Sequence, residues 1–78
     1  MAQDYDFIIA SKDDYDQVFI EIYFQGKFVA MINQEKGIDN LEIEFPGDNV
    51  IETLVTRKIP LEEFLYLLKD AKIKLLGN

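Results

Sequence analysis

Two groups of carboxylates are the side chains of this 78-residue sequence whose types and spacing suggest chemistry. Asp13, Asp14 and Asp16 lie within four positions, and clustered carboxylate oxygens are what calcium binds in proteins. An EF-hand loop, however, also needs a glycine at its sixth position and a closing glutamate, and both are missing here. Asp and Ser side chains favour tight turns because they bond nearby backbone groups. We therefore expect residues 11–16 to form a solvated turn, and we predict no metal site.

Glu42 and Glu44 form the second group. Paired carboxylates can perform acid–base catalysis when a cleft raises the pKa of one of them. Here they alternate with Leu41, Ile43 and Phe45, as in a half-buried strand with its carboxylates on the solvent side. The chain also has no histidine and no cysteine, which removes the commonest general base and the commonest metal ligands. We expect no enzymatic activity and no cofactor.

The net charge of −7 is unevenly distributed along the chain. Residues 1–52 hold twelve acidic and three basic side chains, whereas residues 53–78 hold three and five. An acidic surface disfavours binding to nucleic acid, whose phosphates need Lys and Arg, and it suits a basic protein partner. The alternative is that an excess of acidic residues only keeps a small domain soluble. No apolar run approaches the ~20 residues of a membrane span, and the first residues do not resemble a signal peptide. We expect a cytoplasmic protein with a basic protein partner and with no nucleic-acid or membrane partner.

The strongest structural signal lies in residues 18–33. Two runs rich in β-branched and aromatic residues flank Gln25-Gly26, which predicts a β-hairpin with a two-residue loop. The resulting register assigns to a core face the residues Val18, Ile20, Ile22, Phe24, Val29 and Met31. The opposite face then carries Phe19, Glu21, Tyr23, Phe28, Ala30 and Ile32.

The flanking segments complete the predicted sheet. Residues 5–10 and 41–45 predict two further strands, joined to the hairpin by turns at 11–16 and 34–40. Residues 47–59 are rich in β-branched side chains and fit either a fifth strand or an extended segment that crosses the sheet.

The C-terminal part of the chain predicts one helix. Pro60 suits the first helical position, and Gly77 suits the C-terminal cap. Apolar residues recur at helical spacing and predict one buried face, formed by Leu61, Phe64, Leu65, Leu68, Ala71 and Leu75. Residues 1–78 are therefore expected to form a single α+β domain, in which a four- or five-stranded antiparallel meander sheet carries one C-terminal helix on one face.

One helix leaves the second face of such a sheet uncovered. That face would be an aromatic patch surrounded by carboxylates, and such surfaces bind protein partners. The predicted partner-binding residues are Phe19, Glu21, Tyr23, Phe28, Glu42 and Glu44, with Asp13, Asp14 and Asp16 from the adjoining turn. Two alternatives remain open: residues 47–59 fold over this face, or a second copy of the chain covers it in a homodimer.

Three stretches, EIYFQGKFVAMINQEKG, LEIEFPG and RKIPLEEFLYLLKDA, resemble small bacterial immunity proteins encoded beside polymorphic or contact-dependent toxins. The resemblance spans residues 18–71 and lies in structural motifs. It implies a stoichiometric inhibitor that binds a basic toxin domain, often a nuclease, and blocks its active site. Two further functions remain open, namely a homodimeric assembly module and a DNA-mimic inhibitor of a nuclease. In the DNA mimic, phosphates would be replaced by the carboxylates of Asp16, Glu21, Glu42 and Glu44.

Overall fold

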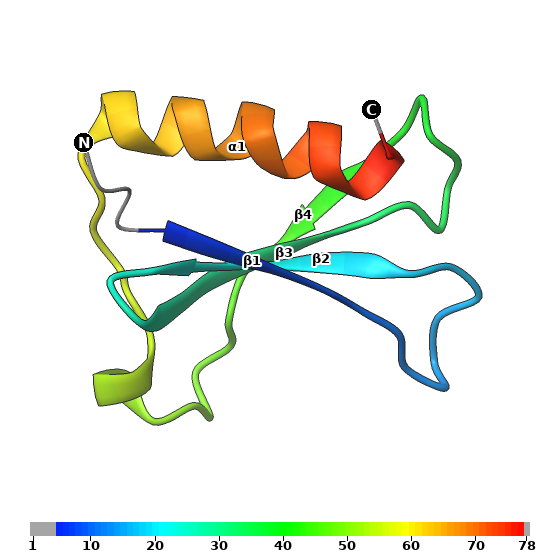
Figure 1. Cartoon of the computed structure of the whole chain (residues 1–78). Coiled ribbons are helices and arrows are strands. Elements are labelled where there is room, and N and C mark those ends of the chain that lie inside the picture. The colour runs from blue at the N-terminus through cyan, green and yellow to red at the C-terminus, as the bar shows by residue number, and fades with distance from the viewer. Residues whose placement is uncertain (1–4, 78) are drawn as a thin grey trace.

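The computed structural model describes residues 5–77 as a four-stranded sheet with one long helix above it (Figure 1). The elements are β1 (Tyr5–Ala10), β2 (Phe19–Phe24), β3 (Lys27–Asn33), β4 (Glu42–Glu44), the short 3-10 helix η1 (Glu52–Leu54) and α1 (Leu61–Leu76). The strands follow the order β1-β2-β3-β4, and all neighbours are antiparallel. The predicted α+β meander with one C-terminal helix is confirmed. Within the described residues, 47–59 contribute η1 and no fifth strand of the sheet.

The tight turn of the predicted hairpin is present. Gln25 and Gly26 both have positive φ angles, 53° and 79°, which is the backbone of a type I′ turn. Phe24 pairs with Lys27, and Tyr23 pairs with Phe28, as the two-residue loop requires. The turn therefore fixes the register of the first two residue pairs.

A β-bulge then shifts the register of the hairpin. Ile22 pairs with Ala30 instead of Val29, so Val29 is an extra residue in β3. Because side chains alternate between the faces of a strand, one extra residue moves all that follow to the opposite face. Ala30 and Ile32 accordingly join the core beneath α1, together with Val29.

The bulge overturns part of the predicted face assignment. Met31 was expected beneath the helix, but it pairs with Glu21 on the opposite face. Ala30 and Ile32 were expected on the open face and instead belong to the core. Val18 was also expected in the core, but it precedes β2 and is 43% exposed.

The helix packs its most buried stripe on the first two strands. Leu67, Ala71 and Leu75 are buried, and α1 makes its main contacts with β2 and β1. Leu61 and Leu65 were expected to be buried but are 68% and 52% exposed. Phe64, Leu68, Ala71 and Leu75 pack on the core as predicted, whereas the buried Leu67 was not predicted. The apolar residues of α1 span a wider arc than its contact with the sheet, so their spacing alone did not fix which of them are buried.

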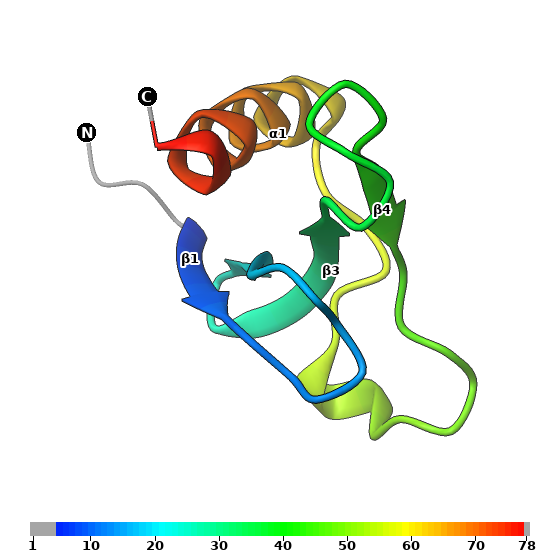
Figure 2. The ribbon, with the colours of Figure 1, turned by 90° about the vertical axis from the view of Figure 1, so that its right-hand side faces the viewer.

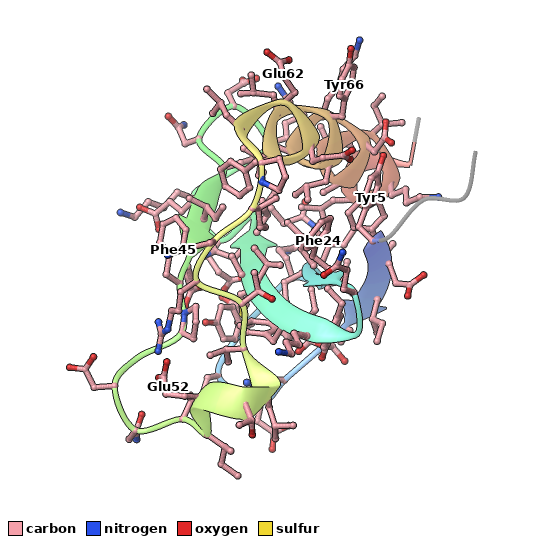
Figure 3. All side chains as sticks on the ribbon, turned by 90° about the vertical axis from the view of Figure 1, so that its left-hand side faces the viewer. Tyr5, Phe24, Phe45, Glu52, Glu62 and Tyr66 are labelled. Carbon is pink, nitrogen blue, oxygen red and sulfur yellow. The ribbon has the colours of Figure 1, made fainter. Side chains whose placement is uncertain are left out.

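The helix ends at Gly77 as predicted, whereas it begins one residue after Pro60, which was expected at the first helical position. Pro60 precedes the first helical residue as the N-cap, and its carbonyl oxygen accepts a hydrogen bond from the Phe64 amide at 3.0 Å. Gly77 ends the helix in the left-handed conformation with φ 77°. At the side of the sheet, the Tyr5 hydroxyl donates to Asp70 Oδ2 at 3.1 Å, which ties β1 to α1. Figure 3 shows Tyr5 and Phe24 beneath the helix, whereas Glu62 and Tyr66 point away from the sheet.

Leu67→Ala and Leu65→Ala form a matched pair that tests the position of the helix. We expect Leu67→Ala to lower the free energy of unfolding by about 2–5 kcal/mol, because it leaves a cavity in the core. Leu65→Ala should cost at most about 1 kcal/mol, because that side chain is half exposed. Urea unfolding followed by circular dichroism measures both values. Equal losses, or a larger loss at Leu65, would contradict this packing.

Candidate interaction surfaces

The face of the sheet that points away from α1 is called the outer face below. The pairing register places on it Asp6, Ile8 and Ala10 of β1, Phe19, Glu21 and Tyr23 of β2, Phe28 and Met31 of β3, and Glu42 and Glu44 of β4. Six of the predicted partner-binding residues therefore share one face, as the strand alternation indicates. Their exposure differs greatly, however, because two irregular segments fold against this side of the sheet.

The loop between β1 and β2 covers one end of the outer face. Its turn is closed by a hydrogen bond from the Tyr15 amide to the Lys12 carbonyl oxygen at 3.0 Å. The Tyr15 ring packs on the Phe19 ring with centroids 5.1 Å apart, and Lys12 Nζ lies 5.8 Å from the same centroid. Phe19 is consequently 0% exposed. The prediction that Phe19 contacts a partner is wrong, since its own loop already buries it.

The segment after β4 covers part of the other end. Val55 forms a parallel bridge with Phe28, and the Thr56 amide donates to the Phe28 carbonyl oxygen at 2.9 Å. Val55 is 7% exposed, as is Met31. The preceding η1 lies on the side of the sheet opposite α1 (Figure 1). Residues 47–59 thus run beside the edge of β3 at Phe28 and bury Val55 there, whereas η1 buries none of its residues, so this segment covers only the margin of the outer face.

An aromatic pair stays partly exposed between these two covers. The Tyr23 and Phe28 rings meet edge to face, with centroids 5.6 Å apart and an interplanar angle of 72°. The Tyr23 hydroxyl donates to Glu21 Oε1 at 3.2 Å. Burial raises the pKa of Tyr23, and the adjacent Glu21 carboxylate raises it further. The pair and its carboxylate form a fixed aromatic contact point beside a negative charge.

Glu44 is held in place by neutral donors. The Tyr15 hydroxyl lies 2.9 and 2.8 Å from its two carboxylate oxygens, and the Asn33 side-chain amide donates to one of them. The hydrogen bond to Glu44 is the main reason why the pKa of Tyr15 is raised. Glu42 differs, because it forms an exposed ion pair with Lys36 at 2.8 Å.

The three aspartates of the β1–β2 loop are exposed. The Asp16 and Gln17 amides donate to the two carboxylate oxygens of Glu35, each at 2.8 Å, and this fixes the loop against the next turn. Within residues 5–77, no group of carboxylates is arranged to hold a metal ion.

The outer face and its loop carry carboxylates that lack cation partners. In the described part of the chain, the ion pairs within 4.0 Å are Lys36–Glu42 and Arg57–Glu52. The carboxylates outside these pairs include Asp6, Glu21, Glu44, Asp13, Asp14 and Asp16. The outer face and the β1–β2 loop therefore carry an excess of carboxylates without cation partners.

A second surface, which the sequence did not predict, lies between α1 and β4. We call it the β4 seam and define it by Ile43 and Phe45 from the strand side, Ile38 from the preceding turn, and Leu61, Phe64 and Leu68 from α1. Two open hollows of about 300 and 470 Å³ lie along it. Phe45, expected to point into the core, is 65% exposed, and Figure 3 shows it at the margin of the molecule. The signal in the sequence that could have indicated the β4 seam is the set of apolar residues of α1, because they form two adjacent stripes.

Tyr15→Phe tests the contact that holds the β1–β2 loop and Glu44 together. The variant should be less stable near neutral pH, because Glu44 loses a hydrogen-bond donor. The raised folded-state pKa of Tyr15 means that its contribution is complete below the ordinary value of 10.0 and is lost as the pH rises through the folded-state value. The stability difference between wild type and Tyr15→Phe should therefore shrink at about pH 11 relative to about pH 8.

Urea unfolding at both pH values measures this difference. Tyr66→Phe is the control, because that side chain is 63% exposed on α1, and it should unfold like the wild type near neutral pH. A Tyr15→Phe variant as stable as the wild type at about pH 8 would contradict the role of this contact.

Comparisons with known proteins assign no family to these surfaces. No protein-family model, no curated protein and no solved structure matches the chain. Among residues 5–77, no helix is both long enough and apolar enough to cross a membrane. The function is therefore inferred from the chain's own side chains.

Proposed function

We propose that this chain is a non-enzymatic acidic binding protein that inhibits a basic partner. In this role it acts as an immunity protein does on a nuclease-type toxin, by covering the active site. The observation that carries the proposal is the set of carboxylates without cation partners on the outer face and the β1–β2 loop. The lack of histidine and cysteine supports a role without catalysis.

Three of the eight basic side chains make contacts within the chain. Lys36 and Arg57 are engaged with Glu42 and Glu52, and Lys12 lies over the Phe19 ring. Carboxylates crowded on one surface repel one another, which costs folding stability. A partner with a basic surface removes this repulsion on binding and is attracted from a distance, which raises the rate of association.

The aromatic pair supplies the second element of an interface. Tyr23 and Phe28 hold each other edge to face, and Glu21 fixes the Tyr23 hydroxyl. Little side-chain freedom is then lost when a partner packs on the pair. Aromatic anchors surrounded by charged residues are the usual composition of protein interfaces.

Co-expression with the neighbouring genes tests the proposed inhibition. Each open reading frame that flanks the gene for this chain is expressed in a bacterial host with and without the chain. We expect one of these products to be basic and toxic, and we expect growth to recover when this chain is present. If no flanking product is toxic, or if this chain relieves none, the proposed inhibitor function is wrong.

Charge variants test the recognition surface once that toxic product is purified. Asp13→Asn/Asp14→Asn and Glu62→Lys change the net charge equally, but Glu62 lies on the solvent side of α1 (Figure 3). We expect the loop variant to slow association at low salt by about three- to tenfold and the helix variant to have little effect. Stopped-flow kinetics at two salt concentrations measures both, and association rates that do not fall with added salt would contradict electrostatic recognition.

A further inference from the structure

We infer that β4 is a docking edge for an extended segment of the partner, in which basic and apolar residues alternate. The segment adds to β4 as a further strand, with its apolar side chains in the β4 seam and its basic side chains beside Glu42 and Glu44. The inference rests on the proposed function for the basic character of the partner, and it specifies how that partner binds.

The backbone of β4 forms one edge of the sheet. β4 pairs with β3 on one side and is the last strand in the sheet order, so its other side is an edge. Figure 2 shows β4 at the margin of the sheet, with α1 set back from it. A strand edge presents a row of backbone donors and acceptors that an incoming strand can use.

The side of this edge that faces α1 is apolar. Ile43 pairs with the core residue Ile32, so it faces the helix side of the sheet. The larger hollow lies at Ile43 and Leu68, and the smaller one lies at Phe45 and Phe64. Side chains two positions apart in a strand point to the same face about 6.6 Å from each other. Ile43 of β4 lines one hollow, and Phe45, which directly follows β4, lines the other. Two hollows at this spacing suit alternate apolar side chains of an added strand, which is how strand addition acquires specificity.

The opposite side of this edge carries two carboxylates. Glu42 and Glu44 lie on the outer face of β4, and Glu44 is fixed by Tyr15 and Asn33 with no cation of the described residues within 4.0 Å. Opposite charges on neighbouring strands stabilise a pair, and like charges destabilise it. An added strand with Lys or Arg pointing to the outer face is therefore favoured beside Glu44, whereas Glu42 already has Lys36 as its partner at 2.8 Å.

The same charges disfavour a second copy of this chain at the edge. Antiparallel pairing of two β4 strands about Ile43 sets Glu42 of one copy opposite Glu44 of the other. Parallel pairing also brings glutamates together. Like charges on paired strands are a known protection against association through edges, so the partner must carry the opposite charge.

Three apolar residues of the β4 seam are largely exposed. Phe45, Leu61 and Ile38 are 65%, 68% and 61% exposed, so a partner segment in the seam would remove apolar surface from water.

Binding of short synthetic peptides tests the inference directly. The probe is the blocked heptapeptide KVKIKVK, and its controls are the non-alternating KKVIVKK and the acidic EVEIEVE. Backbone amide NMR signals of the ¹⁵N-labelled chain report the site and the affinity. We expect KVKIKVK to shift the signals of residues 42–45 and of the α1 side of the seam, and to bind at least about tenfold more tightly than KKVIVKK.

Surface variants with matched controls locate the site. Glu42→Lys, Glu44→Gln and Phe45→Ser should each weaken KVKIKVK binding by about fivefold or more. The glutamine retains an acceptor for Tyr15 and Asn33, so Glu44→Gln removes the charge and leaves the contacts in place. Glu62→Lys is the control for charge, and Ile51→Ser is the control for apolar exposure, because Ile51 is also 65% exposed. Neither control should change binding.

Three outcomes would overturn the inference. Equal binding of KVKIKVK and KKVIVKK, with shifts centred on the β1–β2 loop, would exclude strand addition and leave the proposed acidic recognition intact. If neither KVKIKVK nor KKVIVKK binds, this result would count against strand addition and also against the proposed recognition of a basic partner. A dimer in light scattering that Phe45→Ser dissociates would assign the seam to a second copy of the chain.

Discussion

The width of a single helix is the constraint on which this structure depends. A helix with its side chains is about 10–12 Å across, and neighbouring strands lie about 4.8 Å apart, so one helix covers roughly two strands. Here α1 packs on β1 and β2 through Leu67, Ala71 and Leu75. The inner side of β4 is covered only in part: Leu41 and Ile43 pack against the margin of the core and stay partly exposed, and Phe45 is 65% exposed. The β4 seam follows from this mismatch between one helix and a four-stranded sheet.

The outer face is completed by irregular segments instead of a second helix. Tyr15 covers Phe19, and Val55 lies beside Phe28. Because the Tyr15 hydroxyl also reaches Glu44, the cover of β2 is joined to the far strand of the sheet. One residue thus contributes to the core and orients a carboxylate at the edge, so that the negative surface is held in a fixed geometry by the folding of the loop.

The sequence predicted those features that depend on local chemistry. The turn at Gln25-Gly26 requires positive φ angles, and the caps at Pro60 and Gly77 depend on their own backbones, so each could be recognised without tertiary information. The alternation around Ile43 similarly indicated a strand. These local signals were sufficient for the order of elements and for the fold class.

The features that depend on packing could not be predicted in the same way. From Val29 to Ile32 every residue is apolar, so no alternation fixes the register there, and the bulge at Val29 was missed. The choice between Leu65 and Leu67 depends on where the helix crosses the sheet. The burial of Phe19 depends on a contact with Tyr15 from another part of the chain. The sequence consequently placed Glu21, Glu42 and Glu44 on one face, as the structure does, but it also placed the buried Phe19 among the contact residues, and it did not predict the β4 seam.

The short length and the charge of β4 explain how a small domain can keep an apolar seam open. The strand has three residues, Pro46 follows soon after it, and glutamates occupy both of its outer positions. Short strands, prolines and charges are the features by which natural sheets prevent association through their edges. These features act selectively, however, because glutamates repel an acidic strand and attract a basic one. Such an edge disfavours a copy of itself, and in the binding mode proposed above the same two side chains would also attract the basic strand of a partner.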